Sequence, residues 1–232
     1  MNRHKIKQFW ENRAKLDKGL PRAESIVNLE VDEKLIDLKI SSEIDCVMKH
    51  LTLHESDVLV DLGAGIGQWS LRFAPKVKQI YAVEYVNDFI LAAKERMRSE
   101  NISNVVFIQC SAEEFVSEVP VDQLFISGVL HYLDAEQYGR VIESASNYIR
   151  SGGRIFLREA VSMLGREYEL NDKYSEAAKA NYSALYRTAQ QHIQAFEKQG
   201  FALDEYGPFF EDGSPLNKFP ETRIHYFCFT KV

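Results

Sequence analysis

The chain has 232 residues, 45% of them hydrophobic, so it is long enough to bury the core of one domain. Its formal net charge of -6 argues against broad binding to nucleic acid, where lysines and arginines must replace the phosphate counterions. The sequence has no apolar run of 18 residues, no secretory signal pattern and only three widely spaced cysteines, so we expect a cytoplasmic protein without a membrane partner.

The first 22 residues are basic, with seven lysines and arginines against two acids, and this net charge of +5 leaves -11 for the rest of the chain. Side chains recur here at the spacing of a helix with one apolar face, at Ile6, Phe9, Trp10, Arg13 and Ala14. We expect Gly19-Leu20-Pro21 to end this helix. Two interpretations stay open: a basic helix packed on an acidic body, or a lid from which Arg13 reaches the substrate.

Apolar runs alternate with helical patterns after a second predicted helix, which covers about Ser42–Leu53. The five runs are Val58–Leu62, Gln79–Val83, Val105–Ile108, Gln123–Ser127 and Arg154–Leu157. Helix starts are marked by an N-cap residue with Glu or Gln three positions later, at Ser111 with Glu114, Asp134 with Gln137, and Thr188 with Gln191. This alternation predicts an α/β fold with a mostly parallel, doubly wound sheet and helices on both faces.

The pattern changes after the fifth run. We expect a helical insertion within residues 162–184, with Gly165–Ala180 as its helix, followed by the helix from Thr188 and strands over Phe201–Tyr206 and Ile224–Lys231. No linker or internal repeat is visible, so we predict a single domain over residues 1–232. Residues 1–53 would form a helical cap and residues 54–232 the core.

A glycine-rich turn follows the first apolar run. The run ends in Asp61-Leu62, and glycines stand at positions 63, 65 and 67 before a helical pattern begins. Glycine is needed where the backbone turns sharply or comes close to a ligand, so a nucleotide-type ligand would lie here, at the carboxyl end of the strands. A dinucleotide-binding turn requires glycine at the sixth position, where this chain has Gln68, and this difference separates it from its rival, an NAD enzyme.

This turn resembles motif I of the class I S-adenosylmethionine-dependent methyltransferases. Segments similar to the family's follow later strands, at Glu84, Ser111-Ala112-Glu113 and Ser127-Gly128. The turn Gly152-Gly153 before the fifth strand is similar as well. The resemblance extends from Val58 to Leu157 and more loosely to Val232. It implies a seven-stranded sheet of order 3-2-1-4-5-7-6, with the last strand antiparallel, and S-adenosylmethionine (SAM) as the cofactor.

The resemblance also assigns residues to the cofactor. In the family, the acid at the position of Glu84 accepts both ribose hydroxyls, which uses both carboxylate oxygens. Ser111 stands where the family usually has an acid near the adenine, which implies a weaker contact. The assigned residues are Asp61, Gly63, Ala64, Gly65, Gly67, Trp69, Glu84, Tyr85, Ser111, Ala112, Glu113, Ser127 and Gly128.

Methyl transfer from a sulfonium needs alignment and exclusion of water, and it needs a base only where the acceptor must lose a proton. The candidate catalytic residues are His131, in the loop after the fourth strand, and Glu159, at the end of the fifth. The alternative for His131 is that it only orients this loop. No metal-ligand spacing stands out, so we expect no metal.

We expect the acceptor to be a small, possibly anionic molecule such as a phosphorylated or carboxylated metabolite or a sugar. Ser127-Gly128-Val129-Leu130 stands where methyltransferases of nucleic-acid bases commonly have an Asn/Asp-Pro-Pro-aromatic run, so we expect no nucleic-acid partner. Arginines at the ligand edge would bind a carboxylate or phosphate. The candidate substrate residues are Arg13, Tyr132, Arg158, Tyr182 and Arg187.

Two other functions stay open. The turn over residues 63–67 and Arg187 before the late helix are similar to the protein N-terminal methyltransferases, although Gln68 replaces that family's arginine and its aromatic residues after the fourth strand are missing. A non-catalytic SAM-binding regulator is the other alternative, because no single residue is indispensable to methyl transfer.

Overall fold

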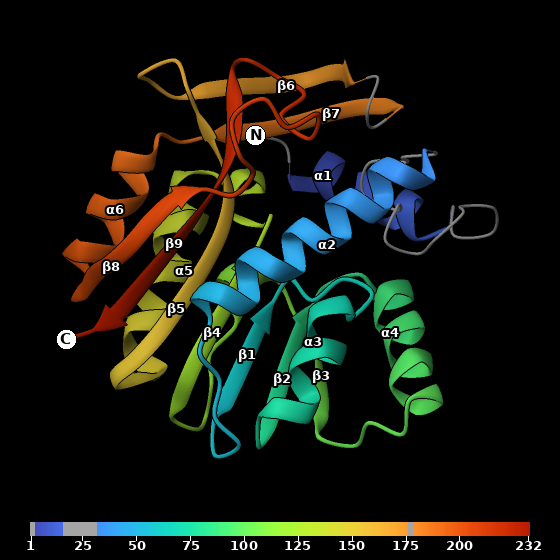
Figure 1. Ribbon diagram of the computed structural model, residues 1–232, viewed down its shortest axis with the longest axis vertical. Coiled ribbons are helices and arrows are strands. Elements are labelled where there is room, and N and C mark those ends of the chain that lie inside the picture. The colour runs from blue at the N-terminus through green and yellow to red at the C-terminus, as the bar shows by residue number, and fades with distance from the viewer. Residues whose placement is uncertain (1–2, 16–31, 176–178) are drawn as a thin grey trace.

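The computed structural model describes residues 3–15, 32–175 and 179–232. Its centre is a sheet with the strand order β3-β2-β1-β4-β5-β9-β8 (Figure 1). These strands are β1 (Val58–Leu62), β2 (Gln79–Glu84), β3 (Val105–Gln109), β4 (Val121–Ser127), β5 (Ile149–Ser162), β8 (Phe201–Pro208) and β9 (Thr222–Lys231). The first five are parallel, and β9 runs antiparallel to both of its neighbours. Within this sheet β8 and β9 are the sixth and seventh strands, so the predicted order 3-2-1-4-5-7-6 is confirmed.

Helices cover both faces of the sheet. One face carries α5 (Ala135–Tyr148) and α6 (Ala189–Lys198), and the other carries α2 (Glu33–His50), α3 (Gln68–Phe73) and α4 (Asn87–Ser99) (Figure 1). Each face has its own apolar core, because every central strand buries alternate side chains on opposite sides. The residues that α5 buries form one apolar stripe along the helix: Tyr138, Val141, Ile142, Ala145 and Tyr148.

The N-terminal helices agree with the prediction only in part. The first helix, α1, spans Arg3–Ala14 as expected, and its single buried residue is Arg13. The second helix begins at Glu33, well before the predicted start at Ser42, and ends at His50. The side chain of Asp32 caps it by accepting a hydrogen bond from the Lys34 amide at 2.9 Å. Its first two turns bury only Ile36. They therefore have no apolar stripe in the sequence from which their helical conformation could be predicted. The expected break at Gly19-Leu20-Pro21 lies outside the described residues.

The segment after β5 is a β-hairpin, so the predicted helical insertion is wrong. Strands β6 (Tyr168–Ser175) and β7 (Ala180–Tyr186) pair antiparallel as a separate two-stranded sheet. The segment contains alanines, lysines and glutamates, which favour a helix. The structure instead follows the period of two in β7, where Ala184 and Tyr186 are buried in alternation, and it accommodates a register shift around Asp172, whose φ is 54°.

Two of the three predicted helix starts are confirmed. Asp134 with Gln137 and Thr188 with Gln191 each form a reciprocal capping box. Ser111 instead precedes a single 3-10 turn, and its hydroxyl donates to Oε2 of Glu114 at 2.7 Å instead of capping a backbone amide. No helix in the described part of the chain is both long and apolar enough to cross a bilayer.

Candidate active site

The turn after β1 borders free space at its centre. Gly63, Gly65 and Gly67 have φ values of 78°, 54° and 72°, a region that other residues rarely adopt. A Cβ on Gly63 would collide with the side chain of Val129, whereas a Cβ on Gly65 would meet no atom of the described residues within 4 Å. The backbone at Gly65 can therefore be approached closely by a ligand.

Glu84 closes this turn from the end of β2. Its Oε2 accepts a hydrogen bond from the Gly65 amide at 2.9 Å, and its Oε1 accepts from the amides of Tyr85 and Val86 at 2.9 and 2.8 Å. Burial raises the pKa of Glu84, and these backbone donors act in the opposite direction. Because two carboxylate oxygens offer about four lone-pair sites, the three amides leave room for a ligand hydroxyl.

Asp61 and Trp69, both assigned to the cofactor from the sequence, support the turn from the core side. Asp61 accepts a hydrogen bond from the hydroxyl of Ser70 at 2.6 Å, and burial raises its pKa to about 6. Trp69 packs against Phe73 and Phe125, with ring centroids 5.6 and 5.2 Å apart. Both residues thus hold the start of α3 against the sheet. Ala64, within the turn, is also buried in this core.

The loop after β4 brings His131 to the same edge of the sheet. Gly128 follows Ser127 with a φ of 69°, and its amide donates to the carbonyl oxygen of Arg158 at 2.9 Å. His131 then lies in a 3-10 turn over Leu130–Tyr132. A Cβ on Gly128 would stand 3.9 Å from Cε1 of His131, so the imidazole lies beside the end of β4.

Glu159 sits behind His131 and is only 1% exposed. Its Oε1 contacts Nδ1 of His131, and its Oε2 accepts a hydrogen bond from the Leu130 amide at 2.7 Å. Burial raises the pKa of Glu159, but the contact with His131 and the other nearby donors outweigh it, so the pKa is lowered overall. The carboxylate is enclosed by its partners, so Glu159 contacts His131 and does not face a substrate directly.

Arg158 and Arg187, predicted to bind an anionic substrate, already have partners within the protein. Arg158 forms an ion pair with Glu43 of α2 and lies over the ring of Phe209. Arg187 is 4% exposed, and it donates to the carbonyl oxygens of Leu130 and Leu133 at 3.1 Å each. Nε of Arg158 is nevertheless buried without a hydrogen-bond partner in the described part of the chain, and the anion clamp expected from the sequence stays a prediction.

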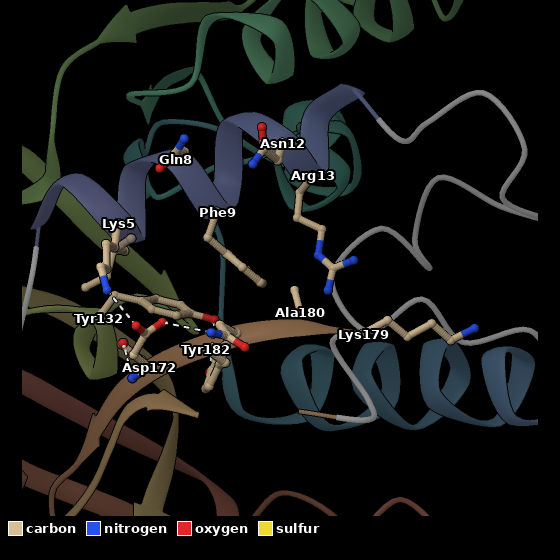
Figure 2. Close-up of a pocket in the computed structure, with 13 residues that line it drawn as sticks. Lys5, Gln8, Phe9, Asn12, Arg13, Tyr132, Asp172, Lys179, Ala180 and Tyr182 are labelled. Atoms are coloured by element: carbon tan, nitrogen blue, oxygen red, sulfur yellow. Dashed lines mark hydrogen bonds and ion pairs between the residues drawn. The ribbon is translucent and has the colours of Figure 1, made fainter. Parts of the chain in front are cut away.

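A pocket of about 440 Å³ lies between α1 and β7 (Figure 2). Three of the residues predicted to bind the substrate line it: Arg13, Tyr132 and Tyr182. Lys5 and Asp172 also line the pocket and form an ion pair at 2.5 Å, and Lys179 adds an exposed positive charge. Arg13 is 2% exposed, and its side chain reaches from α1 toward β7 near Ala180 (Figure 2).

Aromatic side chains join α1 to the loop after β4 and to β7. Trp10 meets Tyr132 edge to face at 5.3 Å, and Phe9 meets Tyr182 in the same way at 5.8 Å. The hydroxyl of Tyr182 donates to that of Tyr132 at 3.1 Å. Trp10 also packs against the buried cluster of Ile66, Val86 and Phe89, and Tyr85, which follows β2, packs against the same cluster. The first helix therefore lies across the edge of the sheet at which the glycine turn and His131 meet.

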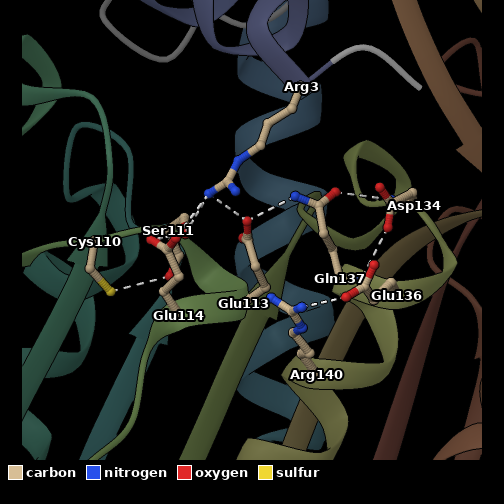
Figure 3. A network of polar contacts seen from close by, with 9 residues as sticks. All are labelled: Arg3, Cys110, Ser111, Glu113, Glu114, Asp134, Glu136, Gln137 and Arg140. Carbon is tan, nitrogen blue, oxygen red and sulfur yellow. Dashed lines mark hydrogen bonds and ion pairs between the residues drawn. The ribbon is translucent and has the colours of Figure 1, made fainter.

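Arg3 fastens the start of α1 to the segment after β3, which the sequence assigned to the adenine (Figure 3). Its Nη2 lies 2.8 Å from Oε1 of the buried Glu113 and 3.2 Å from the hydroxyl of Ser111. Gln137 donates to the same Oε1 at 2.8 Å, and Ala112 packs against the core beneath. Arg3, Lys5 and Asp172 were not among the residues predicted for the site, and the only sequence signal for the first two was the basic charge of the first 22 residues.

The described residues include no group of three or more His, Cys, Asp or Glu side chains that could hold a metal ion. The polar groups that gather at this edge, a strand-end carboxylate, a histidine and backbone amides, are instead those that bind an organic ligand.

Comparison with known proteins places the chain in a family. The model of the methyltransferase domain family matches residues 53–213. A phosphoethanolamine N-methyltransferase 1 from Caenorhabditis elegans is 26% identical over 192 residues, which are 80% of this chain and 38% of that protein. A 23S rRNA (uracil(1939)-C(5))-methyltransferase from Aliivibrio fischeri is 36% identical over 92 residues, which are 40% of this chain and 19% of that protein. The expected exclusion of nucleic acid therefore gains no support.

A solved structure has the same fold over the whole chain. It is the phosphoethanolamine N-methyltransferase 1 of Haemonchus contortus in complex with phosphoethanolamine and S-adenosylhomocysteine, with a TM-score of 0.72 and 17% sequence identity. The match covers 100% of this chain and 51% of that one, so the present chain spans about half or less of the length of these three relatives. Because the family model matches more than half of the chain and the strand order agrees with it, the chain belongs to the methyltransferase domain family, within the class I SAM-dependent methyltransferases.

Proposed function

We propose that this chain transfers a methyl group from SAM to a small acceptor that carries an anionic group and binds beneath α1. The observation that carries this proposal is the pocket between α1 and β7, which is lined by Tyr132 of the loop that carries His131. Donor and acceptor sites must be adjacent for an in-line transfer.

The residues at this edge fit SAM. The backbone at Gly65 borders free space that a side chain would otherwise fill, and Glu84 has a lone pair left for a ribose hydroxyl. The turn after β3, with Ser111 and Glu113, provides acceptors for the adenine amino group. When bound, SAM supplies a methyl group on a positively charged sulfur. This chain's own task is to hold the acceptor in line with that methyl group and to exclude water from it.

The charges around the pocket favour an acceptor with a negative group. Arg13 and Lys179 bring positive charge to its walls, whereas the nearby Asp172 is engaged by Lys5. Burial lowers the pKa of Arg13, so this guanidinium lies in a poorly solvated part of the pocket wall. The similar phosphoethanolamine N-methyltransferases make a phosphorylated amine the first acceptor to test.

The test is transfer of a labelled methyl group from SAM to phosphoethanolamine, compared with ethanolamine, which has the same amine and no phosphate. We expect label on phosphoethanolamine only. Lys179→Gln should raise the KM for phosphoethanolamine, whereas Lys34→Gln, on the exposed start of α2, should not.

Equal labelling of the two amines would overturn the anionic acceptor. Preferred labelling of a peptide N-terminus or of an RNA fragment would assign another acceptor class. SAM binding without transfer to any of these acceptors would favour the regulator that the sequence left open.

A further inference from the structure

Two buried charges of opposite sign hold the loop that carries His131. Arg187 donates to the carbonyl oxygens of Leu130 and Leu133, at 3.1 Å each, and Glu159 accepts a hydrogen bond from the Leu130 amide at 2.7 Å. The peptide groups on both sides of Leu130 are thereby fixed. Buried charges are costly unless each is paired and hydrogen-bonded, so this arrangement constrains the loop to one conformation.

Glu159 also fixes one nitrogen of the imidazole. Its Oε1 contacts Nδ1 of His131 and accepts the amide of Ala160 at 3.1 Å. The pKa of Glu159 is lowered overall, so this group is a carboxylate at neutral pH and can only accept hydrogen bonds. A neutral His131 must then carry its hydrogen on Nδ1, which leaves the lone pair on Nε2.

The second nitrogen has no protein partner. Within residues 3–15, 32–175 and 179–232, no hydrogen bond is made to Nε2 of His131. Tyr132 and Tyr186 cover the ring, with centroids 4.0 and 5.6 Å away, and the adjacent atom Cε1 stands beside Gly128. The titratable groups that face the pair from behind include Arg187 and His192, and burial lowers the pKa of His192 to about 4, so His192 is neutral at pH 7.

We propose that Glu159 is a positioning residue that fixes His131 in the Nδ1–H tautomer, with Nε2 free to take a proton from the acceptor. This inference rests on the proposed function only for its last step. In that step an N–H bond of an ammonium acceptor breaks, an Nε2–H bond forms, and the imidazolium lies against the Glu159 carboxylate, which stabilises its charge. The freed amine lone pair is then the nucleophile.

The direct test is the tautomer of His131 in the ligand-free protein, read from the ring nitrogen chemical shifts of a histidine-labelled sample at a pH where the ring is neutral. The chain has six histidines, and the signal that disappears in His131→Gln identifies the right one. We expect hydrogen on Nδ1 and none on Nε2. Glu159→Gln places an amide group among three hydrogen-bond donors, so it should shift His131 toward the Nε2–H tautomer.

A matched control exists elsewhere in the chain. Glu205 contacts Nδ1 of His50 at 2.9 Å on the surface, and Glu205→Gln should change the His50 signals and leave those of His131 unchanged. Hydrogen on Nε2 of His131 in the unaltered protein would overturn the proposal, and this measurement needs no variant of Glu159. Should Glu159→Gln not fold, Glu159→Asp retains the charge at a greater distance and should give a mixture of the two tautomers.

Turnover separates this proposal from a merely structural role. With phosphoethanolamine as the acceptor, His131→Gln should reduce kcat about 100-fold. Glu159→Asp should reduce kcat and change its pH profile, while the affinity for SAM stays unchanged. An unaltered pH profile and kcat in a folded Glu159→Asp would contradict positioning. Absence of any methyl transfer together with the expected tautomer would count against the proposed function and leave the tautomer assignment in place.

Discussion

The glycine turn and the cover formed by α1 with the β6–β7 hairpin meet at one edge of the sheet, but they are held in different ways. At the turn, the buried carboxylate of Glu84 accepts three backbone amides, and the buried Asp61 is paired with Ser70. At the cover, charged contacts are more exposed: the side chains of Lys5 and Asp172 are 54% and 41% accessible. Salt screens exposed ion pairs far more than buried ones, so the cover can be released without unfolding the turn beneath it.

The largest effect on stability is expected from a substitution in the glycine turn. Gly63→Ala puts a Cβ into the side chain of Val129 at a φ of 78°, so it should lower the free energy of unfolding by about 2 to 3 kcal/mol and impair SAM binding. Gly139→Ala is the control, because Gly139 lies within α5 with no atom of the described residues within 4 Å of its Cβ position. This variant should have a free energy of unfolding about 0.5 to 1 kcal/mol higher than that of the unaltered protein. Urea denaturation measures both. Equal stability of the two variants would show that the turn tolerates a side chain.

The pH dependence of stability tests the buried charge at the same turn. Because the pKa of Asp61 is raised from 3.8 to about 6, the folded protein binds a proton that the unfolded chain releases. This contribution is complete below about pH 4 and is lost as the pH rises toward 6. Asp61→Asn keeps an acceptor for Ser70 but cannot titrate. Between pH 4 and 6 the free energy of unfolding of this variant should therefore fall by about 2 kcal/mol less than that of the unaltered protein. Parallel stability curves for the two proteins between pH 4 and 6 would refute the raised pKa.

A smaller effect is expected at the cover. Amide exchange over residues 3–15 should slow when S-adenosylhomocysteine is added, because a lid becomes ordered over its ligand. Arg3→Ala removes the contacts to Glu113 and Ser111, so exchange in α1 should become faster. The free energy of opening α1 should fall by no more than about 1 kcal/mol, and by less in salt. Arg98→Ala breaks an exposed pair with Glu95 on α4 and should leave α1 unchanged. Equal protection of α1 with and without ligand would make it an ordinary packed helix.

The same contrast explains what could be predicted from the sequence. The strands and the glycine turn are local patterns, so β1 to β4 and the capping boxes at Asp134 and Thr188 were found from neighbouring residues. The strand order required the family resemblance, because pairing between strands is not local. The contacts of Arg158 with Glu43 and of Arg3 with Glu113 join residues more than 100 positions apart, and no spacing rule indicates them.

The hairpin was missed for another reason. Its helix-forming residues outweighed the alternation of Tyr182, Ala184 and Tyr186, which becomes decisive only when the strand packs against the loop of Tyr132 and His131. Tertiary packing thus decided the conformation of this segment, and the pocket that β7 forms with α1 could not be predicted from the sequence pattern alone.

We propose that Glu84 and the glycine turn bind the cofactor. Calorimetric titration of S-adenosylhomocysteine into the unaltered protein and into Glu84→Ala tests it most directly, with Glu95→Ala, an exposed acid on α4, as the control. Loss of charge-assisted hydrogen bonds should weaken binding by about 1.5 to 3 kcal/mol, or roughly 10- to 100-fold, while the control binds normally. The same affinity in a folded Glu84→Ala as in the unaltered protein would contradict the assignment.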